Sequence, residues 1–257
     1  MFHRESHQEH IYSKFHDIPT SLTTPVHLIM KKIKGIRACV FDAYGTLFDI
    51  ASATARCSGI SKEQRAALTP LWRDKQLQYT WLRSLQGHYV DFWRITVDAL
   101  DFSLESLGIT NHDVRDQLLS LYQNLQAFPE VADTLRQLRS AGFKTAILSN
   151  GTPSMLHAAI HSSSLEGLFD HVLSAESVQM FKTHPKVYQY ALDALNLTAD
   201  QISFQSSNAW DAFAASAFGM RVVWCNRYHQ QPEHLPGCPD CIISNLGELP
   251  ALLDIEP

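Results

Sequence analysis

The sequence predicts an α/β protein in which a Rossmann-like parallel sheet forms the core and an all-helical cap is inserted into it. Two observations carry this prediction. From about residue 128 onward, short apolar segments that resemble strands alternate with amphipathic helical segments, which is typical of right-handed βαβ units. Residues 51–126 instead show helical periodicity and no convincing strand pattern. A chain of 257 residues, 45% hydrophobic, is long enough for one such core with an insertion.

The first strand is expected at residues 36–41, a run rich in β-branched and aromatic residues that ends at Asp42. Later strands are expected at 144–148, 171–174, 202–205, 221–224 and 242–243. Helices are expected at 66–83, 90–107, 114–125, 131–140, 185–195 and 209–218. Pro153 opens one more helix, at a position where its missing N–H does no harm.

These elements predict a catalytic core made of residues 35–50 and 127–257, with the helical cap at 51–126. Residues 1–34 are polar and lack sustained periodicity, so they are expected to form a flexible N-terminal extension. His3, His7 and His10 fall at helical spacing and could bind a metal, but nothing nearby in the sequence would bury such a site. A solvated tail is therefore the preferred interpretation.

Composition narrows the function classes. The net charge of −5 argues against a nucleic-acid partner. No apolar run could cross a membrane, and the polar first residues do not resemble a signal peptide. Five cysteines without a disulfide pattern favour a reducing, cytoplasmic location. The C-x-x-C at Cys238–Cys241 lacks the second cysteine pair that structural zinc needs, so we interpret it as incidental.

Polar residues follow several of the expected strands. In a parallel sheet the carboxyl ends of the strands meet at one edge, where ligands bind. Each group also has a structural interpretation, because serine, asparagine and aspartate commonly form turns, a loop lysine is usually solvated, and an aspartate in a first helical turn favours the helix dipole. Their recurrence at successive strand ends favours a site made of Asp42, Ser149, Asn150, Lys182, Ser206, Asn208 and Asp211.

Two motifs resemble a known family. Residues 41–49, Phe-Asp-Ala-Tyr-Gly-Thr-Leu-Phe-Asp, resemble the first motif of the haloacid dehalogenase superfamily. Residues 71–83, Leu-Trp-Arg-Asp-Lys-Gln-Leu-Gln-Tyr-Thr-Trp-Leu-Arg, resemble the cap signature of its L-2-haloacid dehalogenases (type II). The resemblance covers about residues 34–250. It implies hydrolysis of short L-2-haloalkanoic acids to D-2-hydroxy acids, with inversion at C2, no metal and no cofactor.

The resemblance also implies roles for individual residues. Asp42 matches the nucleophile, whose carboxylate attacks C2 and forms an ester, and Arg73 matches the residue that receives the halide. Lys182 matches the lysine that orients the nucleophile, and Asp211 the base that activates the hydrolytic water. Ser149 matches the residue that holds the substrate carboxylate. Further catalytic positions are matched by Thr46, Tyr188, Ser206 and Asn208, and the lining of the substrate and halide pocket by Tyr44, Leu77, Phe92, Asn150 and Trp210.

Two features argue against a metal-dependent phosphatase of the same superfamily, which is the alternative function. Those phosphatases carry a second aspartate where this chain has Tyr44, and acidic residues where it has the Ser206–Asn208 segment. Mg²⁺ prefers carboxylates and water, so Asp42 alone would hold it weakly. A catalytically idle binding protein on the same scaffold is a third possibility. A binding protein would not need all five polar groups of the predicted site, and this chain retains them: Asp42, Arg73, Ser149, Lys182 and Asp211.

Three further expectations concern the surface. Asp74 stands where many relatives have glutamine, and we expect it to face solvent rather than Arg73. His184 stands where an acidic residue is more usual, which we interpret as a surface change. The resemblance implies a homodimer through the cap, with a contact surface supplied by Leu71, Trp72, Leu82 and Leu85.

Overall fold

The computed structural model describes residues 32–253 and 255. Within them, six strands form one parallel sheet in the order β3-β2-β1-β4-β5-β6. β1 is a central strand, so Asp42, the residue after it, lies at the middle of the sheet edge. This arrangement confirms the predicted α/β fold class. The strands are β1 (Ala38–Phe41), β2 (Lys144–Ser149), β3 (His171–Ser174), β4 (Ile202–Ser206), β5 (Arg221–Cys225) and β6 (Cys241–Ile243).

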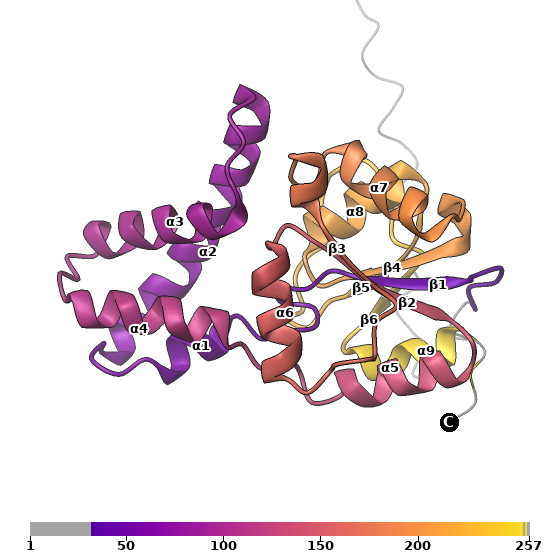
Figure 1. The fold of residues 1–257 in the computed structure, drawn as a ribbon, viewed down its shortest axis with the longest axis horizontal. Coiled ribbons are helices and arrows are strands. Elements are labelled where there is room, and N and C mark those ends of the chain that lie inside the picture. Colours follow the sequence, from indigo (N-terminus) through magenta and orange to yellow (C-terminus); the bar gives the residue numbers. More distant parts are fainter. Residues whose placement is uncertain (1–31, 254, 256–257) are drawn as a thin grey trace, which may run out of the picture. The chain divides into compact units, whose positions relative to one another are not determined.

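Helices cover both faces of the sheet (Figure 1). Cys39 and Phe41 point to the face covered by α5 (Val131–Ser140), α6 (Pro153–Ser162) and α9 (Leu249–Leu252). Ala38 and Val40 point to the opposite face, under α7 (Pro185–Leu195) and α8 (Ala209–Phe218). This period of two explains why β1 is apolar throughout, since both of its faces are buried. Short 3₁₀ helices are η1 (Ala175–Val178), η2 (Ala199–Gln201) and η3 (Leu246–Glu248).

Four helices lie in the insertion between β1 and α5, namely α1 (Ala51–Arg56), α2 (Lys62–Gln86), α3 (Phe92–Ser106) and α4 (His112–Gln123). Backbone hydrogen bonds join the two chain segments that connect the insertion to the core. The N–H of Asp49 donates to the Gln126 carbonyl at 2.9 Å, and that of Phe128 to the Leu47 carbonyl at 3.0 Å. The pairing places the start of the insertion directly after the Asp42 loop.

The expected helices are present, with two differences at the start of the insertion. α1 was not expected, because it has six residues and no capping side chain to mark it. α2 begins at Lys62 rather than residue 66, because Ser61 and Gln64 form a capping box ahead of it. Pro70 lies inside this helix, within the range of 66–83 that was expected from the sequence.

The prediction that Trp72 contributes to a cap surface was wrong. Trp72 is buried, and its indole N–H donates to the Thr96 carbonyl at 2.9 Å. Leu71 is half-buried, whereas Leu82 and Leu85 are exposed. An indole can be buried in a core when its N–H has a hydrogen-bond acceptor. The helical pattern of α2 alone did not reveal that α3 supplies this acceptor.

Residues 1–31, including His3, His7 and His10, lie outside the described residues. Ile33, assigned to the extension by the boundary at residue 34, is buried, and its N–H donates to the Leu252 carbonyl. No helix in the described part of the chain is long and apolar enough to cross a membrane. The same part holds no group of three histidine, cysteine or acidic side chains that could bind a metal ion.

Candidate active site

Asp42 lies at the centre of a buried polar cluster at the carboxyl edge of the sheet. Its Oδ1 accepts a hydrogen bond from Lys182 Nζ at 3.0 Å. Its Oδ2 accepts from Thr46 Oγ1 at 2.9 Å and from Asn208 Nδ2 at 2.8 Å. The carboxylate is only 7% exposed, and such hydrogen bonds hold it in one orientation. Three segments far apart in the sequence therefore meet at one carboxylate.

Lys182 joins Asp42 to a second buried carboxylate. Its ammonium group also donates to Asp211 Oδ2 at 2.8 Å, and the Tyr188 hydroxyl donates to Asp211 Oδ1 at 2.7 Å. Burial would lower the pKa of Lys182, but the carboxylates of Asp211 and Asp42 overcome that effect and raise it. Lys182 is therefore an ammonium ion that lies between two acidic groups and pairs with both.

Burial affects the pKa of Asp211 in the direction opposite to its effect on Lys182, because here the charged form is the deprotonated one. It raises the pKa of this carboxyl, and the negative charge of Asp42 adds to the rise, while Lys182 and the Tyr188 hydroxyl oppose it. A carboxylate with increased proton affinity, fixed by two donors, is suited to accept a proton from a water molecule.

The loop after β4 supports Asp42 through its backbone and Asn208. Ser206 Oγ accepts from the Asn208 N–H at 3.2 Å, and the Ser207 N–H donates to Thr46 Oγ1 at 2.8 Å. Asn208 Nδ2 also donates to the Tyr44 carbonyl at 3.1 Å. Thr46 and Asn208 thus contact the carboxylate directly, whereas Ser206 shapes the loop that carries Asn208.

Arg73 comes from α2 of the insertion and reaches the same loop. Its Nη2 donates to Asn208 Oδ1 at 3.3 Å, and its Nη1 donates to Gln76 Oε1 at 2.7 Å. Asp74 is exposed, as expected for the next residue on a helix. Gln76 was not among the predicted site residues, although its position three residues after Arg73 on a helix was a usable signal.

The turn after β2 contributes Ser149 and Asn150. Ser149 Oγ accepts from the Gly151 N–H at 3.1 Å, and Asn150 Oδ1 accepts from the Lys182 N–H at 2.9 Å. Asn150 therefore also positions the backbone of Lys182. Its Nδ2 group, which could donate to an anion, has no partner among the described residues. A Cβ on Gly151 would lie 2.7 Å from the Tyr44 ring, so only glycine lets this turn pack against Tyr44.

Aromatic side chains surround Tyr44. Its ring centroid lies 5.9 Å from that of Phe92 and 5.6 Å from that of Tyr122, both in the insertion. Phe92 is fully buried and also packs against Phe181, beside Lys182. These contacts place a dry, apolar wall next to the polar cluster.

Leu77 and Trp210 lie in hollows that do not include Asp42. Leu77 lines one of 460 Å³ on α2 with Asp74 and Trp81. Trp210 lines another of 450 Å³ with Thr183 and Tyr188, and packs edge-on against Trp81 at 5.6 Å. Trp210 is nevertheless adjacent in the chain to Asp211. The structure therefore does not include these two residues among the side chains that contact Asp42, which are Lys182, Thr46 and Asn208.

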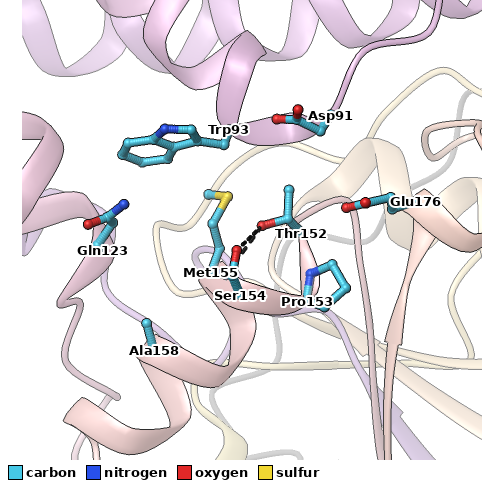
Figure 2. A pocket seen from close by; sticks show the side chains of 9 residues that line it. All are labelled: Asp91, Trp93, Gln123, Thr152, Pro153, Ser154, Met155, Ala158 and Glu176. Carbon is cyan, nitrogen blue, oxygen red and sulfur yellow. Dashed lines mark hydrogen bonds between the residues drawn. The ribbon is translucent and has the colours of Figure 1, made fainter.

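A further pocket of 610 Å³ lies where α6 begins (Figure 2). Ser154 and Met155 line it from α6 and Thr152 from the position before that helix, and Trp93 lines it from α3 and Asp91 from the position before α3. None of its lining residues is among the predicted site residues. Its acidic side chains, Asp91 and Glu176, do not suit a substrate carboxylate, so the cluster around Asp42 is the better candidate.

Residues 36–219 match the family model of a haloacid dehalogenase-like hydrolase. The chain belongs to this family. Within it, the chain is 43% identical over 223 residues to (S)-2-haloacid dehalogenase 1 of Pseudomonas sp. (strain CBS-3), covering 85% of this chain and 96% of that protein. The resemblance to L-2-haloacid dehalogenases inferred from the two motifs is thereby confirmed.

Solved structures of this hydrolase family agree with the fold. A crystal structure of an L-2-haloacid dehalogenase superposes with a TM-score of 0.82 at 43% identity, covering 85% of this chain and 98% of that one. The L-2-haloacid dehalogenase of Xanthobacter autotrophicus, with chloropropionic acid covalently bound, gives a TM-score of 0.79 at 34% identity, with the same coverage of both chains.

Replacing Lys182 with methionine should destabilise the fold. The change removes the only ammonium group between two buried carboxylates in the described structure, and breaking such a pair costs about 3–5 kcal/mol. Because the pKa of Lys182 is raised on folding, its stabilisation is present below its unfolded pKa and is lost as pH rises through the folded pKa. Neutral pH lies below the unfolded pKa of Lys182, so the full stabilisation is present there and the substitution should remove all of it. The measurement is urea unfolding at pH 7.

The matched control is Lys186→Met, which removes an exposed lysine four residues along the chain. It should leave the free energy of unfolding nearly unchanged. Equal effects of the two substitutions would contradict a buried ion-pair role for Lys182.

Proposed function

We propose that this hydrolase converts short L-2-haloalkanoic acids to D-2-hydroxy acids through an ester on Asp42, without a metal. One observation carries the proposal: a buried carboxylate is held by Lys182, Thr46 and Asn208, and the Arg73 guanidinium reaches the same Asn208 from the insertion. The names of the relatives, (S)-2-haloacid dehalogenases, support the same substrate class.

In the first step an oxygen of Asp42 attacks C2 of the substrate. A carbon–oxygen bond forms as the carbon–halogen bond breaks, and the halide leaves with the bonding electron pair. In-line attack from the opposite side inverts C2. Arg73 and the Nδ2 group of Asn150 would bind the departing halide, and the apolar wall of Tyr44 and Phe92 would exclude water from it.

In the second step water attacks the carbonyl carbon of the ester, and Asp211 accepts a proton from that water. The tetrahedral intermediate then expels the oxygen bonded to C2, which leaves as the hydroxyl of the product after protonation. Asp42 regains a carboxylate that contains one oxygen from water. Thr46 and Asn208, which already donate to Oδ2, would stabilise the negative oxygen of the intermediate.

The substrate carboxylate would bind at the turn that leads from β2 into α6. The Ser149 hydroxyl and the backbone N–H groups of the turn itself are suitable donors, because a strand-to-helix turn presents such groups to an anion. Trp210, next to Asp211 in the chain, and Leu77, four residues after Arg73 on α2, would contact the alkyl substituent, beyond the inner wall formed by Tyr44.

The donor set supports a reaction without a metal. Lys182 Nζ lies 3.0 Å from Asp42 and 2.8 Å from Asp211, so a cation of the protein itself stands between the carboxylates. Tyr44 and the Ser206–Asn208 segment add no carboxylate for Mg²⁺. A phosphatase, the alternative, would need such ligands.

The test is halide release from racemic 2-chloropropionate in EDTA, with chiral analysis of the product. We expect release from the L isomer alone, yielding D-lactate, at a rate that EDTA does not change. A large loss in EDTA would contradict the metal-free mechanism. No release of halide, with Mg²⁺-dependent release of phosphate from an aryl phosphate, would favour the phosphatase. If the protein released neither halide nor phosphate, that result would favour an idle binding scaffold.

We further propose that the protein works as a cytoplasmic homodimer. The family resemblance implies contact through the cap, and the exposed side chains of Leu82 and Leu85 at the end of α2 support such a surface. Light scattering after gel filtration would measure the mass, and Leu85→Glu should lower it toward the monomer.

A further inference from the structure

Arg73 is positioned by neutral groups. Its two described acceptors are amide oxygens, Oε1 of Gln76 and Oδ1 of Asn208. Among the described residues, no carboxylate lies within ion-pair distance of its guanidinium, and other arginines of the insertion, such as Arg83 and Arg115, do pair with aspartates. The charge of Arg73 is therefore available to an anion from outside the protein.

Gln76 is held more rigidly than a surface glutamine. It is 1% exposed, and its Nε2 donates to Thr96 Oγ1 at 2.8 Å and to the Tyr122 hydroxyl at 3.0 Å. Thr96 donates its own proton to the Phe92 carbonyl at 2.7 Å, so it must accept from Gln76. A guanidinium can only donate, so the carbonyl oxygen of the amide must face Arg73. Partners on both sides thus determine the orientation of the amide.

This arrangement extends to the nucleophile. Arg73 donates to Asn208 Oδ1, and Nδ2 of the same amide donates to Asp42 Oδ2. Tyr122, the other partner of Gln76, stacks on Tyr44. Burial raises the pKa of Tyr122, and the Arg73 cation opposes the rise. A continuous series of contacts therefore connects Gln76 to Asp42.

We propose that Gln76 is a positioning residue: it holds the Arg73 guanidinium toward the nucleophile without neutralising it. The proposal rests on the proposed function, in which Arg73 receives the halide. A carboxylate at this position would hold the guanidinium equally well but would pair with its charge. A neutral acceptor holds the group in place and leaves the charge for the leaving halide.

The test is single-turnover halide release with 2-chloropropionate and 2-bromopropionate, using Gln76→Glu, Gln76→Met and Gln78→Glu. Gln76→Glu supplies a competing anion, and Gln76→Met removes the acceptor at similar volume. Gln78→Glu adds the same charge on the exposed face of the same helix, where Gln78 accepts a hydrogen bond from Lys75. Thermal unfolding of each variant is measured in parallel.

Chloride is the poorer leaving group, so its departure depends more on stabilisation by Arg73. We expect both Gln76 variants to lose about tenfold or more with the chloro substrate and clearly less with the bromo substrate. Gln78→Glu should keep the wild-type rates and their ratio.

An equal loss for both substrates would overturn the proposal, because it would show a structural role alone, and so would unchanged rates. Absence of halide release from the wild type would overturn the proposed function together with this inference. Wild-type release with unaffected Gln76 variants would overturn only the inference.

Discussion

Replacing Asp42 with asparagine should abolish turnover, lowering kcat by about 10⁴-fold or more. Asparagine has the same shape, and its carbonyl oxygen can still accept from Lys182, but its NH₂ group then faces the NH₂ group of Asn208, so that one hydrogen bond of the cluster is lost. The amide is not nucleophilic enough to form the ester with C2. The measurement is steady-state halide release by freshly purified protein, together with mass spectrometry to detect an ester.

Asp49→Asn is the matched control, because Asp49 lies on the same loop and, among the described residues, its carboxylate accepts only from the Ala51 N–H. It should retain nearly full activity. Full activity of Asp42→Asn would reject Asp42 as the nucleophile. If Asp42→Asn loses activity and also unfolds at a much lower temperature, the same measurement is made on Asp42→Ser, which also lacks the carboxylate.

Replacing Asp211 with asparagine should separate the two chemical steps. Its amide oxygen can face Lys182, which only donates, and its NH₂ group can donate to the Tyr188 hydroxyl, so the fold is expected to persist. The variant lacks the base for the hydrolytic water. We expect a burst of about one halide per active site, and then a rate about 10³-fold below wild type. The ester should accumulate on the Asp42 peptide.

Asp200→Asn is the control, since Asp200 is an exposed carboxylate on η2, away from the cluster. It should show neither a burst nor trapped ester. If Asp211→Asn loses the burst as well, Asp211 acts on the nucleophile through Lys182 rather than on water. Unchanged turnover would remove Asp211 from the mechanism.

The position of the cluster could be predicted because it depends on topology. Each strand of a parallel sheet points its carboxyl end to the same edge, so Asp42, Ser149 and Asn208 had to converge once the strands were recognised. Both motifs that carry the family resemblance are continuous in sequence, so each could be recognised without knowledge of the fold. The α/β core could therefore be inferred from local patterns.

Other features depend on side-chain packing between distant segments. Trp72 was assigned to a surface because its position on α2 did not reveal that Thr96 of α3 satisfies its indole. The same applies to Gln76, whose partners lie on α3 and α4. Asn150 was expected to contact halide, and its bond to the Lys182 backbone could not be seen without the loop geometry. Contacts of this kind require the assembled structure.

The central claim, an ester on Asp42 hydrolysed at its carbonyl carbon, is tested most directly by a single turnover in water labelled with a heavy oxygen isotope. With enzyme in excess over 2-chloropropionate, the label should enter the Asp42 side chain, located by mass spectrometry of its peptide. The first lactate formed should carry unlabelled oxygen, since that atom comes from Asp42. Label in the lactate hydroxyl, with none in Asp42, would show direct attack of water on C2 and contradict the account.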